Sequence, residues 1–152
     1  MARPRSVQVR DMLPGDLSEV LAIERQVFDT PWTIDFFLSC VRDGSRCRLL
    51  EVDGKPGGYC ILHQVRDRAE IYTLAVSPPL QGHGFGRLLL RDAISGARDG
   101  AASSVVLEVR PGNTRAVNLY ESEGFTDLSR IADYFENSDG TTEDARVMSR
   151  RP

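Results

Sequence analysis

The sequence predicts an α/β fold, in which a mixed and mostly antiparallel β-sheet carries helices on both faces. Segments with alternating polar and apolar residues recur along the chain, and segments with helical 3–4 spacing lie between them. Three strand segments follow one another through tight turns, which join antiparallel strands. A later strand–loop–helix–strand unit spans residues 70–110 and predicts a right-handed crossover between parallel strands.

Length and composition indicate one globular domain. The 152 residues suit a single domain, which we expect to span residues 1–152. No apolar stretch of about 18 residues is present, so we expect no transmembrane helix and no membrane partner. The arginine-bearing N-terminus has no apolar run behind it, which excludes a secretory signal and predicts a cytoplasmic protein. A net charge of −3 argues against a nucleic-acid partner.

The cysteines and histidines show no pattern that is typical of a chemical site. Cys40, Cys47 and Cys60 form no CxxC pair, so we expect free thiols in a reducing compartment. The histidines are His63 and His83, and no acidic residues join them at ligand spacing. The sequence therefore predicts no metal site.

The first half of the chain predicts a strand, two helices and three further strands. Apolar residues from Leu17 to Phe28 recur at helical spacing after a turn and N-cap at residues 13–16, and Pro31 ends this helix. Trp32 and Thr33 open a second, short helix. Strands are expected at residues 6–10, 46–52, 58–65 and 70–76, with turns at residues 53–54 and 67–68.

The second half predicts a loop, two helices, a strand and a final hairpin. The two prolines in Ser77-Pro78-Pro79-Leu80 make this segment rigid and end the preceding strand. Residues 81–87 then form a glycine-rich loop. The expected elements after it are a helix ending at Asp99-Gly100, a strand at residues 104–110, a helix from Asn113 to about Ser122, and a hairpin from Phe125 onward. A long polar loop is expected in that hairpin at residues 137–143.

The loop Gln81-Gly82-His83-Gly84-Phe85-Gly86-Arg87 is a candidate anion site. Glycines let several backbone N–H groups point one way, and the N-terminus of the following helix favours negative charge. Arg87 and Arg91 add positive charge on the first turn of that helix. A diphosphate is the predicted ligand, and a turn that merely joins strand to helix is the alternative.

Loop spacing distinguishes between classes of diphosphate site. A P-loop needs Gly-Lys followed by Ser or Thr, which this loop lacks. A GxGxxG loop fails because its third glycine would fall at Arg87 or at Leu89. The pattern that fits is Gln81-x-x-Gly84-x-Gly86, which resembles the coenzyme A pyrophosphate loop of the GCN5-related N-acetyltransferase (GNAT) family.

Glu108 and Tyr120 are the candidate proton-transfer residues. Glu108 lies inside the apolar run Val105–Val109; if it is buried, a raised pKa would let it accept a proton near neutral pH. Alternation along the strand would instead place it on a polar face. Asn113 and Tyr120 lie seven residues apart, on one face of the next helix. A core aromatic with its hydroxyl at the rim is the alternative for Tyr120.

The run LEVRPGNTRAVNLYESEGF closely resembles the corresponding run of the RimI-type GNAT subfamily, the bacterial ribosomal-protein N-terminal acetyltransferases. The resemblance extends to Leu74-Ala75-Val76, Pro31-Trp32, Tyr134-Phe135 and residues 143–145, and so covers nearly the whole chain. It implies the GNAT fold, whose mostly antiparallel sheet has a central splayed pair of parallel strands. It also implies acetyl-CoA as the co-substrate.

Residue roles follow from this resemblance. It implies that Glu108 takes a proton from the amine and that Tyr120 protonates the departing CoA thiolate. Trp32, Tyr134 and Phe135 are expected to flank the acceptor. The residues expected to contact acetyl-CoA are Leu74, Ala75, Val76, Gln81, Gly82, His83, Gly84, Phe85, Gly86, Arg87 and Asn113.

The resemblance suggests that the acceptor is the α-amine of a protein or peptide N-terminus, such as that of a ribosomal protein. Phe135 stands where the subfamily usually has a second tyrosine, so a lysine side chain or a small-molecule amine stays open. A non-catalytic acetyl-CoA sensor is a further alternative. Removal of Met1 would expose Ala2, similar to the subfamily's target, and raises the hypothesis of self-acetylation. The sequence does not predict an oligomeric state.

Overall fold

A computed structural model of the chain describes residues 6–152, so Ala2 and the self-acetylation hypothesis lie outside the described residues. The strands are β1 (Val7–Asp11), β2 (Arg46–Val52), β3 (Lys55–Val65), β4 (Arg68–Val76), β5 (Ser104–Val109), β6 (Thr126–Glu136) and β7 (Thr142–Arg150). The helices are α1 (Leu17–Val27), α2 (Ile34–Arg42), α3 (Phe85–Asp99) and α4 (Thr114–Ser122), with short 3-10 helices at Pro14–Asp16 and Pro78–Leu80. Strands and α-helices follow one another in the predicted order.

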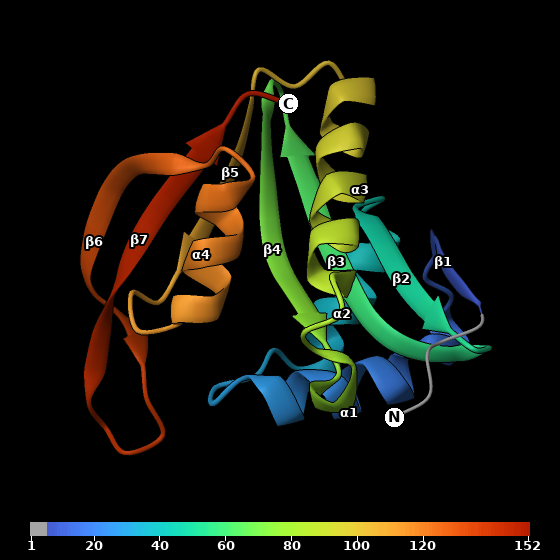
Figure 1. Cartoon of the computed structure of the whole chain (residues 1–152). Coiled ribbons are helices and arrows are strands. Elements are labelled where there is room, and N and C mark those ends of the chain that lie inside the picture. The colour runs from blue at the N-terminus through green and yellow to red at the C-terminus, as the bar shows by residue number, and fades with distance from the viewer. Residues whose placement is uncertain (1–5) are drawn as a thin grey trace.

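The strands form one mixed sheet in the order β1-β2-β3-β4-β5-β7-β6. β4 and β5 are parallel, and the other neighbouring strands are antiparallel. Helix α3 makes the crossover between the two parallel strands, as Figure 1 shows. The predicted α/β fold and its mostly antiparallel sheet are confirmed.

Two hydrophobic clusters form the core, one on each face of the sheet. On one face α3 and α4 pack against the strands through residues such as Leu89, Leu90 and Val117. On the opposite face α1 and α2 pack through Val20 and Phe37 (Figure 1). Burial of apolar side chains on both sides fixes the sheet between two helical layers, as the sequence predicts.

The pairing between β4 and β5 ends before the strands do. Arg68–Ile71 pair with Ser104–Leu107, whereas residues 73–76 have no partner in β5. On the other side of β4, the register with β3 shifts so that Tyr72 is an extra residue between two paired positions. Such a bulge bends a strand and increases its twist. The expected splayed parallel pair is therefore confirmed.

The start of α1 differs from the expected N-cap. The Asp16 carboxylate accepts a hydrogen bond from the Leu13 N–H at 2.8 Å and pairs with Arg10 at 2.9 Å. It therefore fixes the turn before the helix, and makes no side-chain bond to α1 itself. At the start of α2 the expected cap is present, because Thr33 Oγ1 accepts from the Phe36 N–H at 3.4 Å.

The loop of the final hairpin is shorter than the sequence predicts. β6 and β7 pair up to Glu136 and Thr142, so only residues 137–141 connect them. Cys40, Cys47 and Cys60 are buried and free, which confirms the prediction of free thiols. None of the described helices is long and apolar enough to cross a membrane.

Gly58 on β3 has no room for a side chain. A Cβ atom there would lie 2.7 Å from the Ala75 carbonyl oxygen and 3.2 Å from Leu89 Cδ1. We expect Gly58→Ala to lower the free energy of unfolding by about 1–3 kcal/mol, because backbone and core must shift to admit it. Urea unfolding measures this, with Gly15→Ala as the control, since a Cβ at Gly15 meets nothing within 4 Å. Equal stability of the two variants would contradict the prediction.

Candidate active site

The end of β4 presents a free backbone edge towards β5. Leu74 is half-buried, and Ala75 and Val76 are buried. Their pairing with β3, which includes Val76 opposite Gly58, uses the backbone groups that point to one side only. The groups that point towards β5 have no strand partner, so an extended ligand with amide groups can add to this edge.

The glycine-rich loop lies directly after this edge and forms an anion-binding backbone. Gly82 and Gly84 both have φ of +83°, a conformation that favours glycine. The first bond of the following helix runs from the Leu88 N–H to the Gly84 carbonyl at 3.1 Å. In the described part of the chain, the backbone N–H groups of residues 82–87 therefore have no acceptor. This arrangement suits a phosphate group.

Two loop side chains hold the shape of the loop. Gln81 Nε2 donates to the Val76 carbonyl at 3.0 Å, and Gln81 Oε1 accepts from Arg115 Nη1 at 2.8 Å. His83 Nδ1 lies 3.0 Å from the Leu80 carbonyl oxygen. Both side chains thus face the protein, and the loop offers mainly its backbone to a ligand. Sequence reasoning missed Arg115, because only the tertiary structure brings it to Gln81.

The arginines of the first α3 turns are paired within the protein. Arg87 Nη1 lies 3.0 Å from Ser122 Oγ and 3.2 Å from Glu123, and Arg91 Nε lies 2.6 Å from the same carboxylate. The Arg91 and Arg87 guanidinium groups hold the pKa of Glu123 below its usual range. Their charge is partly neutralised, so the anion site depends mainly on backbone N–H groups.

Glu108 is exposed, so of the two alternatives for this residue the structure shows the polar face and not the buried one. Leu107 and Val109 belong to the core under α3 and α4, so alternation along β5 turns Glu108 towards the opposite face. The pKa of Tyr134 is raised to about 12, mainly by its hydrogen bond to Glu108 and then by burial. The structure thus brings together a residue expected to transfer a proton and one expected to flank the acceptor.

Tyr120 lies in the core on the α4 side of the sheet. It is 7% exposed and packs edge-on against Phe125, with ring centroids 5.8 Å apart. Burial raises the pKa of Tyr120 well above its usual value. Within residues 6–152 its hydroxyl has no hydrogen-bond partner. Tyr120 and Glu108 therefore lie on opposite faces of the sheet.

Asn113 caps α4 rather than beginning it. Its Oδ1 accepts from the Ala116 N–H at 3.3 Å, and the helix starts at Thr114. The cap uses one lone pair of the side-chain carbonyl oxygen, and the amide nitrogen makes no hydrogen bond within residues 6–152. The cap thereby fixes the start of α4, the helix that carries Tyr120.

Aromatic side chains gather on the Glu108 face. Trp32 is 46% exposed and stacks on Phe36, with ring centroids 4.1 Å apart. Phe36 lies 5.9 Å from Tyr72, the bulged residue of β4. Tyr134 and Phe135 contact each other edge-on at 4.9 Å. The sequence singled out Trp32, Tyr134 and Phe135, but not Phe36 or Tyr72, whose place depends on the bulge and on the seating of α2.

Two connections meet beside these aromatic residues. Asp29, between α1 and α2, accepts from the Ser138 N–H and Oγ at 3.0 and 2.9 Å. Arg110 donates to Thr30 Oγ1 at 3.3 Å and to Asn137 Oδ1 at 2.6 Å. The α1–α2 connection and the β6–β7 turn are therefore joined at the end of β5.

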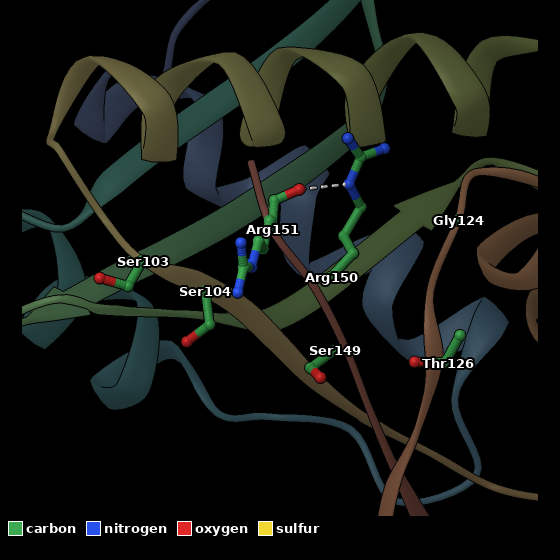
Figure 2. Close-up of a pocket in the computed structure, with 7 residues that line it drawn as sticks. All are labelled: Ser103, Ser104, Gly124, Thr126, Ser149, Arg150 and Arg151. Carbon is green, nitrogen blue, oxygen red and sulfur yellow. Dashed lines mark hydrogen bonds between the residues drawn. The ribbon is translucent and has the colours of Figure 1, made fainter.

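A polar hollow of about 580 Å³ lies elsewhere, beside the first residues of β5 and the end of β7 (Figure 2). Its lining residues are Ser103, Ser104, Gly124, Thr126, Ser149, Arg150 and Arg151. None of the residues that the sequence predicts for the site lines it. The splayed strands and the glycine-rich loop, at the other end of β5, therefore define the candidate site.

Comparison with known sequences identifies relatives of this chain. The ribosomal protein bS18-alanine N-acetyltransferase of Escherichia coli (strain K12) is 33% identical over 134 residues, which cover 88% of this chain and 90% of the relative. The protein of the same name from Haemophilus influenzae is 31% identical over 137 residues, covering 88% and 91%.

Solved structures share the fold over most of the chain. The ribosomal-protein-S18-alanine N-acetyltransferase from Escherichia coli has a TM-score of 0.89 and 30% identity, and covers 96% of this chain and 94% of its own. Ard1 from Thermoplasma volcanium has a TM-score of 0.87 and 25% identity, covering 95% and 97%. The profile of the acetyltransferase (GNAT) family matches residues 14–125. With this match, the splayed strands and the glycine-rich loop, the chain belongs to the acetyltransferase (GNAT) family.

Proposed function

We propose that this protein transfers the acetyl group of acetyl-CoA to the N-terminal α-amine of a protein. The observation that carries the proposal is the open end of the β4–β5 pair, which lies between Glu108 on one face and Tyr120 on the other. Its relatives are named as ribosomal protein bS18-alanine N-acetyltransferases, which supports a ribosomal protein beginning with alanine as the acceptor.

Acetyl-CoA fits the α3 and α4 side of this opening. The free edge at Leu74–Val76 suits the amide groups of the pantetheine arm, which would extend the sheet by β-augmentation. The unpaired N–H groups of residues 82–87 suit the pyrophosphate. The Asn113 amide nitrogen is free to contact the pantetheine or acetyl region. The Val76 N–H is the group that we assign to polarise the thioester carbonyl.

The acceptor amine would enter from the aromatic face, where Glu108 lies. An amine is protonated near neutral pH and must lose a proton before it attacks the carbonyl carbon. Glu108 is exposed, so water can relay that proton to its carboxylate. The nitrogen then bonds to the acetyl carbon and loses its second proton to solvent, and the carbon–sulfur bond breaks. No acyl-enzyme is required, which agrees with three buried cysteines.

Tyr120 suits the role of the acid on the opposite face. Because burial raises its pKa, the phenol keeps its proton at neutral pH. Its hydroxyl, unpaired within residues 6–152, can donate that proton to the departing thiolate sulfur. A non-catalytic sensor would need neither this donor nor Glu108 beside the opening, so both residues favour an enzyme.

Proton-transfer variants test these roles. We expect Glu108→Gln and Tyr120→Phe each to lower kcat by roughly 10²–10⁴, because each removes one proton transfer. Binding of acetyl-CoA, measured by calorimetry, should change little, since neither residue belongs to the loop. Glu19→Gln, on the exposed face of α1, is the control and should keep wild-type turnover. Wild-type turnover in both site variants would overturn the assignment.

A charge in the loop tests the phosphate site. Gly84→Asp places a carboxylate beside the N–H groups of residues 82–87, where like-charge repulsion costs several kcal/mol, so we expect acetyl-CoA to bind roughly 10²-fold or more weakly. Gly44→Asp is the matched control, because Gly44 also has positive φ and nothing within 4 Å of an added Cβ. Equal affinity of the two variants in calorimetry would refute the loop assignment.

Two peptides test the acceptor. One begins with a free alanine α-amine and contains no lysine, and the other is blocked at its N-terminus and contains one lysine. We expect CoA release with the first peptide only, because the relatives are named for N-terminal alanine acetylation. Release with the lysine peptide alone would contradict the proposed acceptor. Bound acetyl-CoA without release on either peptide would favour a small-molecule amine or a sensor.

A further inference from the structure

Glu24 on α1 is a buried carboxyl to which the proposed reaction gives no role. It is 1% exposed, and Glu24 and Thr73 are the buried polar side chains within residues 6–152. A carboxyl is rarely buried without partners, because desolvation penalises its charge. Burial accordingly raises the pKa of Glu24, while its hydrogen bonds lower it. No ion pair involving Glu24 occurs in the described part of the chain, so hydrogen-bond donors alone hold the carboxyl.

Three donors from three different segments meet at this carboxyl. Glu24 Oε1 accepts from the Tyr59 hydroxyl on β3 at 2.7 Å and from Thr73 Oγ1 on β4 at 3.0 Å. Glu24 Oε2 accepts from the backbone N–H of Trp32, just before α2, at 3.0 Å. One side chain therefore connects α1, two strands and the α1–α2 connection.

Two of the residues that donate hydrogen bonds to Glu24 lie beside the proposed binding sites for acetyl-CoA and the acceptor. Thr73 lies in the part of β4 that lacks pairing with β5, directly before the edge assigned to acetyl-CoA. Trp32 is one of the aromatic side chains on the Glu108 face, where the acceptor is proposed to bind. The other ties of the α1–α2 connection, at Asp29 and Thr30, run outwards to the β6–β7 turn and to Arg110. Among the hydrogen bonds between side chains and this connection, the Glu24 bond is the one that draws it inwards, towards β4.

We propose that Glu24 is a positioning residue that holds the Trp32 segment against β4 and thereby sets the width of the acceptor slot. The inference rests on the proposed function, because it assumes that Trp32 flanks the acceptor. Without this bond the Trp32 segment loses its hydrogen bond towards β4, and the slot widens. The peptide then binds more weakly, whereas the loop and the free edge still bind acetyl-CoA.

A set of variants separates this role from general stabilisation. Glu24→Met keeps a side chain of similar length but accepts no hydrogen bond, and Glu24→Asp keeps the charge but is too short to reach all three donors. Glu24→Gln is the conservative rescue, because its oxygen can accept from Trp32 while its nitrogen donates to the two hydroxyls. Tyr59→Phe is the matched control, because it removes a different hydrogen bond to the same carboxyl. Tyr59 lies on β3, which is held in the sheet by pairing with β2 on one side and β4 on the other.

Tryptophan fluorescence gives a readout that needs no acceptor. Trp32 is the only tryptophan in the sequence, so its emission reports on this segment alone. We expect Glu24→Met and Glu24→Asp to raise the rate of quenching by acrylamide about twofold, because the segment loses its inner tie. Glu24→Gln and Tyr59→Phe should stay near the wild-type value. Wild-type quenching in both Glu24→Met and Glu24→Asp would overturn the proposal, and Glu24→Asp alone decides if Glu24→Met does not fold.

Steady-state kinetics with the alanine peptide give the second readout. We expect Glu24→Asp to raise KM for the peptide by about tenfold, since small displacements of positioning groups have effects of this size, with KM for acetyl-CoA unchanged. Glu24→Gln should recover most of that loss. Equal peptide KM in Glu24→Asp and Tyr59→Phe would also overturn the proposal. If wild-type enzyme acetylates no peptide, the proposed function fails, and the quenching data still decide the role of Glu24.

Discussion

The early end of pairing between β4 and β5 is the constraint on which the rest of the site depends. Complete pairing would seal the sheet and satisfy the backbone groups at Leu74–Val76. Instead, the bulge at Tyr72 turns β4 away after Ile71, and the sheet stays open between its two helical layers. The two residues to which we assign proton transfer lie on opposite faces of this sheet, Tyr120 on α4 and Glu108 on the side of α1 and α2. Continuous pairing would separate the two faces of the sheet, whereas the opening between β4 and β5 connects them.

Much of the fold could be predicted from the sequence because local patterns determine it. Helical spacing and the stop at Pro31 give the helices, and Thr33 has the side chain that an N-cap needs. The loop could be predicted as well, since Gly82 and Gly84 adopt a backbone conformation that few other residues tolerate. The parallel arrangement of β4 and β5 follows from the crossover through α3. Each of these features needs information from only a short stretch of chain.

What could not be predicted depends on contacts between distant parts of the chain. The bond of Gln81 to Arg115 spans 34 residues, and the bonds of Glu24 to Tyr59 and Thr73 span 35 and 49 residues. The exposure of Glu108 follows from which face of β5 the helices cover, a fact that its apolar neighbours in sequence conceal. Spacing can therefore nominate residues for a ligand site, whereas the side chains that contact and orient those residues emerge only from the tertiary structure.

The burial of the cysteines has a practical consequence for following turnover. Burial raises the pKa of Cys47 to about 11, and also raises the pKa values of Cys40 and Cys60 above the usual range of a thiol. Thiol reagents attack the thiolate and must reach the sulfur, so all three side chains are doubly protected. A thiol-reactive dye added to the folded enzyme therefore reports the free CoA that each acetyl transfer liberates, against little background from the protein. The dye reacts with the three cysteines, and so reports unfolding, only when the core opens.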